Sequence, residues 1–432
     1  MRMLIFVAAD CVLLFAGCDV SRAPIEISGA TMGTQYRVTI ARPSGGIDIE
    51  ALQREIDAEL RRINAQMSTY LPDSEISTFN SQNDVDWFEV SPEFASVVKR
   101  ARRFSEETAG AFDVTVGPLV NRWNFGPHQA SLEMPSDAEV ATLAQSVGFR
   151  LIEVREEPPA LRKQRPDVQI DLSAIAKGFA VDRITQLLES RGLKNCLAEI
   201  GGEIRARGTK ANRAAWTVGI EKPIANARVM QRVVPLRDVA LATSGDYRNF
   251  IEIDGRRYSH MIDPRTGYPV DHRLASASVI ADNCLSADAW ATALMVLGPE
   301  HGYELAKRQG IPALLIERTE IGFAQRATPE FESIVTAAQI TESGITDSEA
   351  SQAMSVFFCT LAAFALAVAA MAIGVMINNR RLTGSCGGLA GWKDASGRPL
   401  CEFCSNPSED CRLSLRERNA LSRSESQQSA GD

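Results

Sequence analysis

One uncharged stretch near the C-terminal end divides the chain. Residues 354–377 contain no Asp, Glu, Lys or Arg and are rich in Ala, Phe, Leu, Val and Met. A helix of this length rises about 1.5 Å per residue and spans a hydrocarbon core of about 30 Å, so the stretch predicts a transmembrane helix. The alternative is a buried helix of a soluble protein, which rarely stays free of charge for so long. Arg380 and Arg381 follow directly, so the positive-inside rule places the C-terminal tail in the cytoplasm.

A second apolar stretch begins the chain and predicts export. Residues 1–17 have a basic start and an apolar core that is short for a membrane span, which is typical of a signal peptide. Small residues just before Cys18 resemble a bacterial lipoprotein processing site, which implies cleavage there and lipidation of the Cys18 thiol. Asp19 resembles a signal for retention in the inner membrane. The alternative is an uncleaved anchor, and both interpretations place the middle of the chain in the periplasm.

The segment between these ends predicts one compact domain. We expect it over residues 29–340, after a linker at 18–28 and before a second linker at 341–353. Strand-like runs and segments with apolar residues at helical spacing both occur in it, the strands at 37–40, 277–280 and 314–316 and the helices at 49–66 and 174–191. Because these elements are mixed rather than strictly alternating, the predicted fold class is α+β.

Charge and motifs exclude several classes of function. The formal net charge is -8, which argues against nucleic acid as a partner. The chain has no G-x-G-x-x-G after a strand and no G-x-x-x-x-G-K-[ST]. Neither a dinucleotide-binding fold of the usual kind nor a P-loop is therefore indicated.

Asp288 and Thr292 form the first candidate site. They are four residues apart in a helical segment for which Ser286 is the predicted N-cap, so the carboxylate and the hydroxyl lie on one helix face. Two hard oxygens at this spacing suit Mg²⁺, which keeps positions open for phosphate. The alternative is that Asp288 only compensates the helix dipole.

His260 is the second candidate. It stands between a strand-like run and the turn-forming sequence Asp263-Pro264-Arg265-Thr266-Gly267. A neutral imidazole in such a position can act as a general base near pH 7. A hydrogen-bonded structural histidine is an equally good interpretation of the sequence alone.

Several motifs together resemble the ApbE family of FAD:protein FMN transferases. The resemblance runs in order over about residues 29–330 and rests on GATMGT (29–34), MSTY (67–70), PDSE (72–75), FDVTVGPL (112–119), DLSAIAKG (171–178), TSG (243–245) and the segments around His260 and Asp288. It implies an enzyme that uses Mg²⁺ and moves the FMN phosphate of FAD onto a Thr or Ser hydroxyl of a target flavoprotein, releasing AMP. A pyrophosphate repels a nucleophile, so a metal ion helps to admit it.

The resemblance also implies roles for single residues. It makes Asp288, Thr292 and the main-chain carbonyl of Ala174 the Mg²⁺ ligands and His260 the base for the target hydroxyl. It implies that FAD is bound by a further set of side chains, which are Met32, Tyr70, Lys177, Asp182, Glu199 and Ser244. The run AEIGGEIRARG at 198–208 is then expected to help form the site.

The tail is predicted to be a second unit. Residues 378–412 contain four closely spaced thiols, Cys386, Cys401, Cys404 and Cys411, before a disordered end at 413–432. In a cytoplasmic tail such thiols suit iron or Zn²⁺, and the alternative is a flexible tail with scattered cysteines. The helix and these cysteines resemble NqrM, a family that assists maturation of the sodium-translocating NADH:quinone reductase.

The two resemblances together indicate a role in the maturation of one enzyme complex. The reductase carries FMN on a threonine and also an iron centre, so we expect this chain to flavinylate its subunits while the tail assists iron delivery. The expected location is the bacterial inner membrane, with the catalytic domain in the periplasm and the tail in the cytoplasm. The competing functions are an FAD pyrophosphatase that uses water as its nucleophile and a flavin-binding or assembly lipoprotein without catalysis.

Overall fold

The computed structural model describes residues 23–43, 46–127, 133–224, 229–253 and 255–378. The chain divides into two compact units, Met1–Ser348 and Glu349–Asp432. The signal peptide, Cys18 and the four tail cysteines lie outside the described residues. The candidate site residues of the middle segment all lie in the first unit, to which the following description mainly refers.

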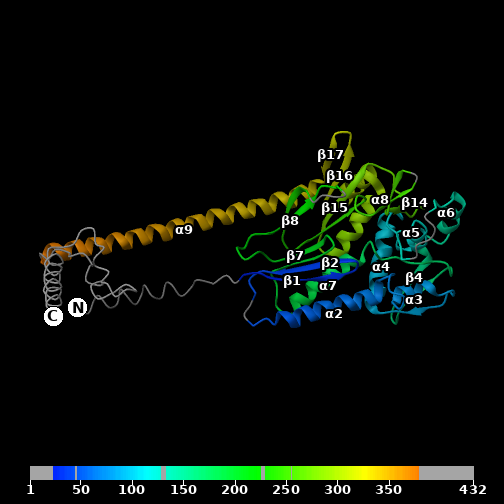
Figure 1. Ribbon diagram of the computed structural model, residues 1–432, viewed down its shortest axis with the longest axis horizontal. Coiled ribbons are helices and arrows are strands. Elements are labelled where there is room, and N and C mark those ends of the chain that lie inside the picture. Colours follow the sequence, from blue (N-terminus) through cyan, green and yellow to red (C-terminus); the bar gives the residue numbers. More distant parts are fainter. Residues whose placement is uncertain (1–22, 44–45, 128–132, 225–228, 254, 379–432) are drawn as a thin grey trace, which may run out of the picture. The chain divides into compact units, whose positions relative to one another are not determined.

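An eight-stranded antiparallel sheet is the centre of the first unit (Figure 1). Its order is β1-β2-β6-β7-β10-β15-β16-β17. The strands are β1 (Ile25–Thr31), β2 (Thr34–Ile40), β6 (Cys196–Ile200), β7 (Glu203–Arg207), β10 (Ala240–Gly245), β15 (Leu274–Ala281), β16 (Ala313–Thr319) and β17 (Gly322–Ala327). The mixture of this sheet with helices confirms the predicted α+β class.

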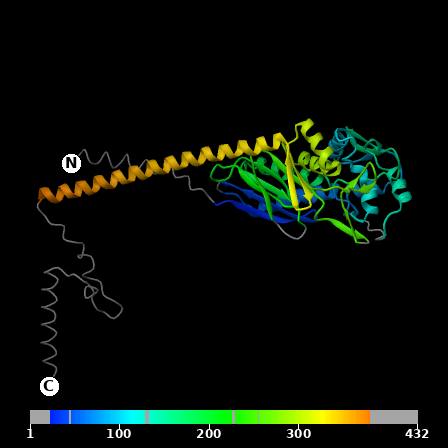
Figure 2. The ribbon, with the colours of Figure 1, turned by 90° about the horizontal axis from the view of Figure 1, so that it is seen from above.

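Both faces of the sheet are covered (Figure 2). In β16, Ala313 and Leu315 join the core on one face and Leu314 and Ile316 join the core on the other, as the two-residue repeat of a strand requires. The first core is shared with helices α2 (Ile49–Met67), α7 (Ala176–Ser190) and α8 (Cys284–Gln309). The second is shared with the hairpin of β8 (Trp216–Glu221) and β9 (Met230–Leu236) and with the start of α9 (Pro329–Asn378).

Smaller elements complete the first unit. A three-stranded sheet contains β3 (Phe88–Glu89), β5 (Pro159–Lys163) and β4 (Ile152–Glu156). The short hairpins are β11 (Phe250–Ile253) with β12 (Arg256–Ser259) and β13 (Ile262–Asp263) with β14 (Tyr268–Pro269). The remaining helices are α3 (Glu75–Ser81), α4 (Pro92–Glu107), α5 (Gly117–Arg122) and α6 (Asp137–Ala144), with 3-10 turns at Val114–Val116 and Phe149–Leu151.

The start of α8 differs from the sequence prediction. The N-cap is Asn283 rather than Ser286, because the Asn283 side chain accepts a hydrogen bond from the Ser286 backbone N–H at 3.0 Å. Ser286 therefore lies in the first turn, and its hydroxyl donates to the same Asn283 oxygen at 2.8 Å. The helix consequently begins at Cys284, three residues earlier than it would if Ser286 were the N-cap.

The predicted transmembrane segment 354–377 falls in helix α9. Within the part of the chain that the structure describes, no helix is long and apolar enough to cross a membrane. The transmembrane prediction is therefore not confirmed.

Candidate active site

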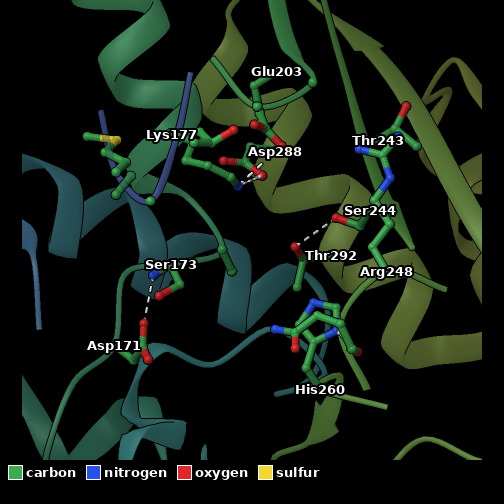
Figure 3. Close-up of a pocket in the computed structure, with 18 of the residues that line it drawn as sticks. Asp171, Ser173, Lys177, Glu203, Thr243, Ser244, Arg248, His260, Asp288 and Thr292 are labelled. Carbon is green, nitrogen blue, oxygen red and sulfur yellow. Dashed lines mark hydrogen bonds and ion pairs between the residues drawn. The ribbon is translucent and has the colours of Figure 1, made fainter. Parts of the chain in front are cut away.

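A cleft of about 1760 Å³ brings together residues that are far apart in the sequence (Figure 3). It lies among the β1–β2 turn, the β6–β7 turn, the first turns of α7 and α8, and the segment after β12. Nine of the predicted site residues line it, namely Met32, Tyr70, Ala174, Lys177, Glu199, Ser244, His260, Asp288 and Thr292. The structure thus brings together nine of the ten site residues predicted for the middle segment.

Two buried carboxylates and a lysine form the charged part of the cleft (Figure 3). Asp288 is 1% exposed and Glu203 is 3% exposed. The Lys177 Nζ lies 3.2 Å from the Glu203 Oε1 and 3.9 Å from the Asp288 Oδ1. Two carboxylates thus share a single ammonium, which leaves an excess of negative charge that suits a bound cation.

Burial shifts the pKa values of all three groups. Burial raises the pKa of Glu203 and of Asp288 above their ordinary values, although the Lys177 cation opposes the shift in each. For Lys177, burial alone would lower the pKa, but the Asp288 and Glu203 carboxylates outweigh it and hold the pKa above the ordinary range. Lys177 is therefore a cation at neutral pH.

Close packing of two helix starts positions Asp288. The Gly178 N–H of α7 donates to the Asp288 Oδ2 at 3.0 Å. A Cβ at position 178 would lie 2.4 Å from the Cys284 carbonyl oxygen, so the two helices could not come this close with a larger residue. The other carboxylate oxygen of Asp288 is left on the side of Lys177.

Hydroxyl and carbonyl groups supply further hard oxygens. The Ser244 Oγ of β10 lies 3.1 Å from the Thr292 Oγ1 of α8, and Ala174 lies on the cleft wall just before α7. Within the described residues, no group of three or more His, Cys, Asp or Glu is placed to hold a metal ion. The predicted Mg²⁺ donors are of another kind, because they combine one carboxylate with a hydroxyl and a backbone carbonyl.

His260 is half-buried in the same cleft. Its Nδ1 lies 2.9 Å from the Asn249 carbonyl oxygen. A carbonyl oxygen can only accept a hydrogen bond, so the His260 Nδ1 must donate and carries the proton of the neutral ring. The Nε2 is then left as a hydrogen-bond acceptor. Burial lowers the pKa of His260 below 6.5, and the Lys177 cation adds to this shift, while the bond to Asn249 opposes it. A neutral imidazole with an available Nε2 is what a general base requires.

Three of the predicted FAD-binding residues line the rim or the wall of the cleft. Met32 adopts a positive φ of 48° in the turn between β1 and β2, which turns the backbone into the cleft. Tyr70 is 64% exposed, and its hydroxyl donates to the Phe125 carbonyl at 3.3 Å. Glu199 lies on β6 near the cleft end of that strand. Exposed aromatic and polar groups of this kind are available to a large ligand.

Asp182 does not line the cleft. Its carboxylate is buried, pairs with Arg205, and accepts hydrogen bonds from the backbone N–H groups of Cys284 at 2.9 Å and Leu285 at 3.0 Å. These are the first two residues of α8, whose free N–H groups need acceptors. Asp182 therefore anchors the helix that carries Asp288 and Thr292 and is not among the residues that line the cleft.

Replacing Asp182 by Asn is expected to lower the free energy of unfolding by about 3 kcal/mol, because it leaves the largely buried Arg205 side chain without a charged partner. Thermal and denaturant unfolding of the full chain would measure the loss. A matched control is Glu189→Gln, which breaks the more exposed pair with Arg207 and should cost less than about 1 kcal/mol. Equal losses in the two variants would contradict the anchoring role.

The structure adds residues that the sequence interpretation did not single out. Glu203, Asp171 and Arg248 all line the cleft. Asp171 accepts a hydrogen bond from the Ser173 backbone N–H at 2.7 Å and so shapes the loop before α7, while Arg248 pairs with Glu221. The signal for Glu203 in the sequence came only through its neighbours, because it follows the Gly201-Gly202 turn inside the run 198–208 that the resemblance expects to help form the site.

Comparisons with known proteins agree with this geometry. A model of the ApbE family matches residues 32–315. The chain is 43% identical over 325 residues to a Vibrio cholerae FAD:protein FMN transferase, covering 75% of this chain and 97% of that protein. It is 36% identical over 336 residues to a protein of the same name from Escherichia coli K12, covering 75% and 95%.

Two solved structures are similar as well. The flavin transferase ApbE from Vibrio cholerae has a TM-score of 0.67 and 42% identity, covering 72% of this chain and 99% of that one. The Pseudomonas stutzeri flavinyl transferase ApbE in its apo form has a TM-score of 0.68 and 36% identity, covering 73% and 98%. The matched region is the part of the chain that contains the cleft.

Proposed function

The chain belongs to the ApbE family and is an FAD:protein FMN transferase, and we propose that its cleft moves the FMN phosphate of FAD onto a Thr or Ser hydroxyl of a target protein. The observation that carries this proposal is the pairing, in one cleft, of a buried cation-attracting cluster at Asp288 with a neutral acceptor nitrogen at His260. The first suits a pyrophosphate with its cation and the second suits a hydroxyl nucleophile.

The proposed reaction balances without an oxidant or a further reactant. The hydroxyl oxygen of the target forms a bond to the phosphorus of the FMN half of FAD. The bond from that phosphorus to the oxygen bridging to AMP breaks, and AMP leaves with that oxygen. The hydroxyl proton passes to the His260 Nε2. The products are the FMN phosphoester of the target and AMP.

The oxygen donors of the cleft fit Mg²⁺. Among the described residues, buried Asp288 has an ion pair only with Lys177, which it shares with Glu203, and the Glu203 Oε2 has no hydrogen-bond partner. We propose that Asp288, Thr292 and the Ala174 carbonyl would hold the ion. A bound Mg²⁺ would supply charge neutralisation for the pyrophosphate.

The remaining cleft residues are proposed to hold FAD. Tyr70 and Met32 offer an aromatic and an apolar surface at the rim for the flavin ring. Lys177 offers the cation for the phosphates, and Ser244 and Glu199 offer hydrogen-bonding groups on the sheet side. Such a division of apolar rim and polar interior is common in cofactor sites.

The pH dependence of the transfer follows from His260. Because burial lowers its pKa, the imidazole stays neutral and competent until the pH falls below 6.5, and activity is lost as the pH falls through the lowered pKa. We therefore expect kcat/KM for the acceptor to be flat around neutrality with an acid limb centred below 6.5. A pH profile with saturating FAD and Mg²⁺ measures this, and a limb centred above 7 would contradict it.

We further propose that the targets are subunits of the sodium-translocating NADH:quinone reductase and that the chain works at the bacterial inner membrane. The support comes from the sequence, through the lipoprotein-like Cys18, the uncharged run 354–377, and the NqrM-like cysteines. In this proposal the cleft faces the periplasm, and Cys386, Cys401, Cys404 and Cys411 bind iron or Zn²⁺ in the cytoplasm and assist iron delivery.

Co-expression tests whether the reductase subunits are targets of this chain. Reductase subunits would be produced with and without this chain, and covalent FMN would be read as fluorescence of their bands on a denaturing gel. The proposal predicts fluorescent bands only with the chain. If the bands fluoresced equally with and without the chain, the reductase would not be its target. The transferase activity itself would then be measured on other acceptor proteins.

A further inference from the structure

Glu203 is a buried carboxylate of the cleft whose position is closely determined. It is the first residue of β7 and follows Gly201 and Gly202, which both adopt positive φ, at 62° and 110°. Only glycine adopts such a pair of conformations readily, so the turn from β6 brings the start of β7 back to the cleft at a fixed angle. The backbone of Glu203 pairs with that of Ile200 in the sheet.

The contacts of Glu203 point to a single partner. Its Oε1 lies 3.2 Å from the Lys177 Nζ, whereas its Oε2 is buried and has no hydrogen-bond partner among the described residues. At 3% exposure, water reaches this carboxylate poorly. An uncompensated buried carboxylate is costly, so Glu203 and Lys177 hold each other firmly.

Lys177 has two carboxylates within reach and is nearer to one of them. Its Nζ is 3.2 Å from the Glu203 oxygen but 3.9 Å from the Asp288 Oδ1, which is longer than a hydrogen bond. Asp288 takes its hydrogen bond from the Gly178 backbone instead. Lys177 therefore pairs with both carboxylates but lies closer to Glu203, and its ion pair with the Asp288 Oδ1 is longer than a hydrogen bond (Figure 3).

We infer that Glu203 is a positioning residue that holds Lys177 away from Asp288 and so keeps the Asp288 carboxylate open for a divalent cation. This inference rests on the proposed Mg²⁺ site at Asp288. An ammonium bonded to Asp288 would compete with the cation for the same oxygen, because both are attracted by one negative charge. Glu203 prevents the competition by offering Lys177 a better placed partner.

Direct binding of Mn²⁺ to the full-length chain without FAD tests this inference. The electron paramagnetic resonance signal of free Mn²⁺ falls as the ion binds, so the readout does not depend on activity. For Glu203→Gln, which preserves the shape of the side chain but not its charge, we expect at least about 10-fold weaker Mn²⁺ binding. For the double variant Glu203→Gln with Lys177→Met, in which the competing ammonium is gone, we expect the affinity to return to within about 3-fold of the unmodified chain.

The other outcomes each have one meaning. If Glu203 were itself a ligand of the cation, the double variant would bind as weakly as Glu203→Gln, and the inference would be overturned. If the charge at Glu203 mattered only for folding, Glu203→Gln would lower the melting temperature and leave the Mn²⁺ affinity unchanged, which would also overturn it.

A reference variant separates this inference from the proposed function. Asp288→Asn should abolish the Mn²⁺ binding that the Glu203 variants are compared with, and any binding that remains belongs elsewhere in the chain and is subtracted. If Asp288→Asn left Mn²⁺ binding unchanged, the proposed metal site would fail. If Asp288→Asn abolished binding while Glu203→Gln did not weaken it, only the role of Glu203 would fail.

Discussion

Replacing Asp288 by Asn is expected to lower kcat/KM for FMN transfer by about 1000-fold. Asn keeps an oxygen that can accept from the Gly178 N–H, so the packing of α7 against α8 should survive. The substitution removes the negative charge that is proposed to hold Mg²⁺ beside Thr292. It also leaves Lys177 with Glu203 as its only carboxylate partner in the cluster. The measurement is the rate of AMP release and of acceptor labelling at fixed FAD and Mg²⁺.

The matched control for this prediction is Asp282→Asn. Asp282 is exposed, lies just before the start of α8, and is not part of the cleft lining. Its substitution should change the rate by less than about 2-fold, since a lone surface charge contributes little. A melting temperature near that of the unmodified chain would show that Asp288→Asn is folded. A folded Asp288→Asn variant that still transfers FMN at the normal rate would contradict the proposed metal site.

Replacing His260 by Ala is expected to lower the transfer rate by about 100- to 10,000-fold, which is the range that a general base contributes. The Nε2 is the proposed acceptor of the hydroxyl proton, and no other histidine lines the described part of the cleft. The loss should appear in kcat, because the acceptor can still bind. The acid limb of the pH profile should also disappear, since its titrating group is gone.

Two further observations make the His260 result specific. His301 is exposed and lies outside the cleft, so His301→Ala should keep the full rate and the full pH profile. Added imidazole should restore part of the activity of His260→Ala, because the deleted ring leaves space beside the Asn249 carbonyl. A His260→Ala variant with an unchanged rate and an unchanged acid limb would exclude His260 as the base.

Local patterns in the sequence predicted the elements that carry the cleft. The helical spacing over 49–66 and 174–191 corresponds to α2 and α7, and the strand-like run 37–40 lies in β2. These elements have one clear apolar face, which is a property of neighbouring residues and can be read along the chain. The resemblance in sequence motifs then identified nine of the residues that line the cleft.

The partners of those residues could not be predicted in the same way. Asp182 bonds to Cys284 and Leu285, and Glu203 bonds to Lys177, across separations that only the folded sheet and helices close. For this reason Asp182 was expected to touch the flavin nucleotide although it anchors α8. The N-cap of α8 was missed for a related reason, because Asn283 and Ser286 are both good caps and the packing of the helix start decides between them.

The central claim is that the cleft transfers FMN to a protein hydroxyl rather than to water. The most direct test is to incubate the full-length chain with FAD, Mg²⁺ and a flavin-free reductase subunit, and to follow the intact mass of the subunit together with the release of AMP. We expect that the subunit gains the mass of one FMN, that one AMP is released for each adduct, and that little AMP forms without the subunit. Rapid AMP release at the same rate with and without the subunit, with no gain in its mass, would show that water is the acceptor and would contradict this claim.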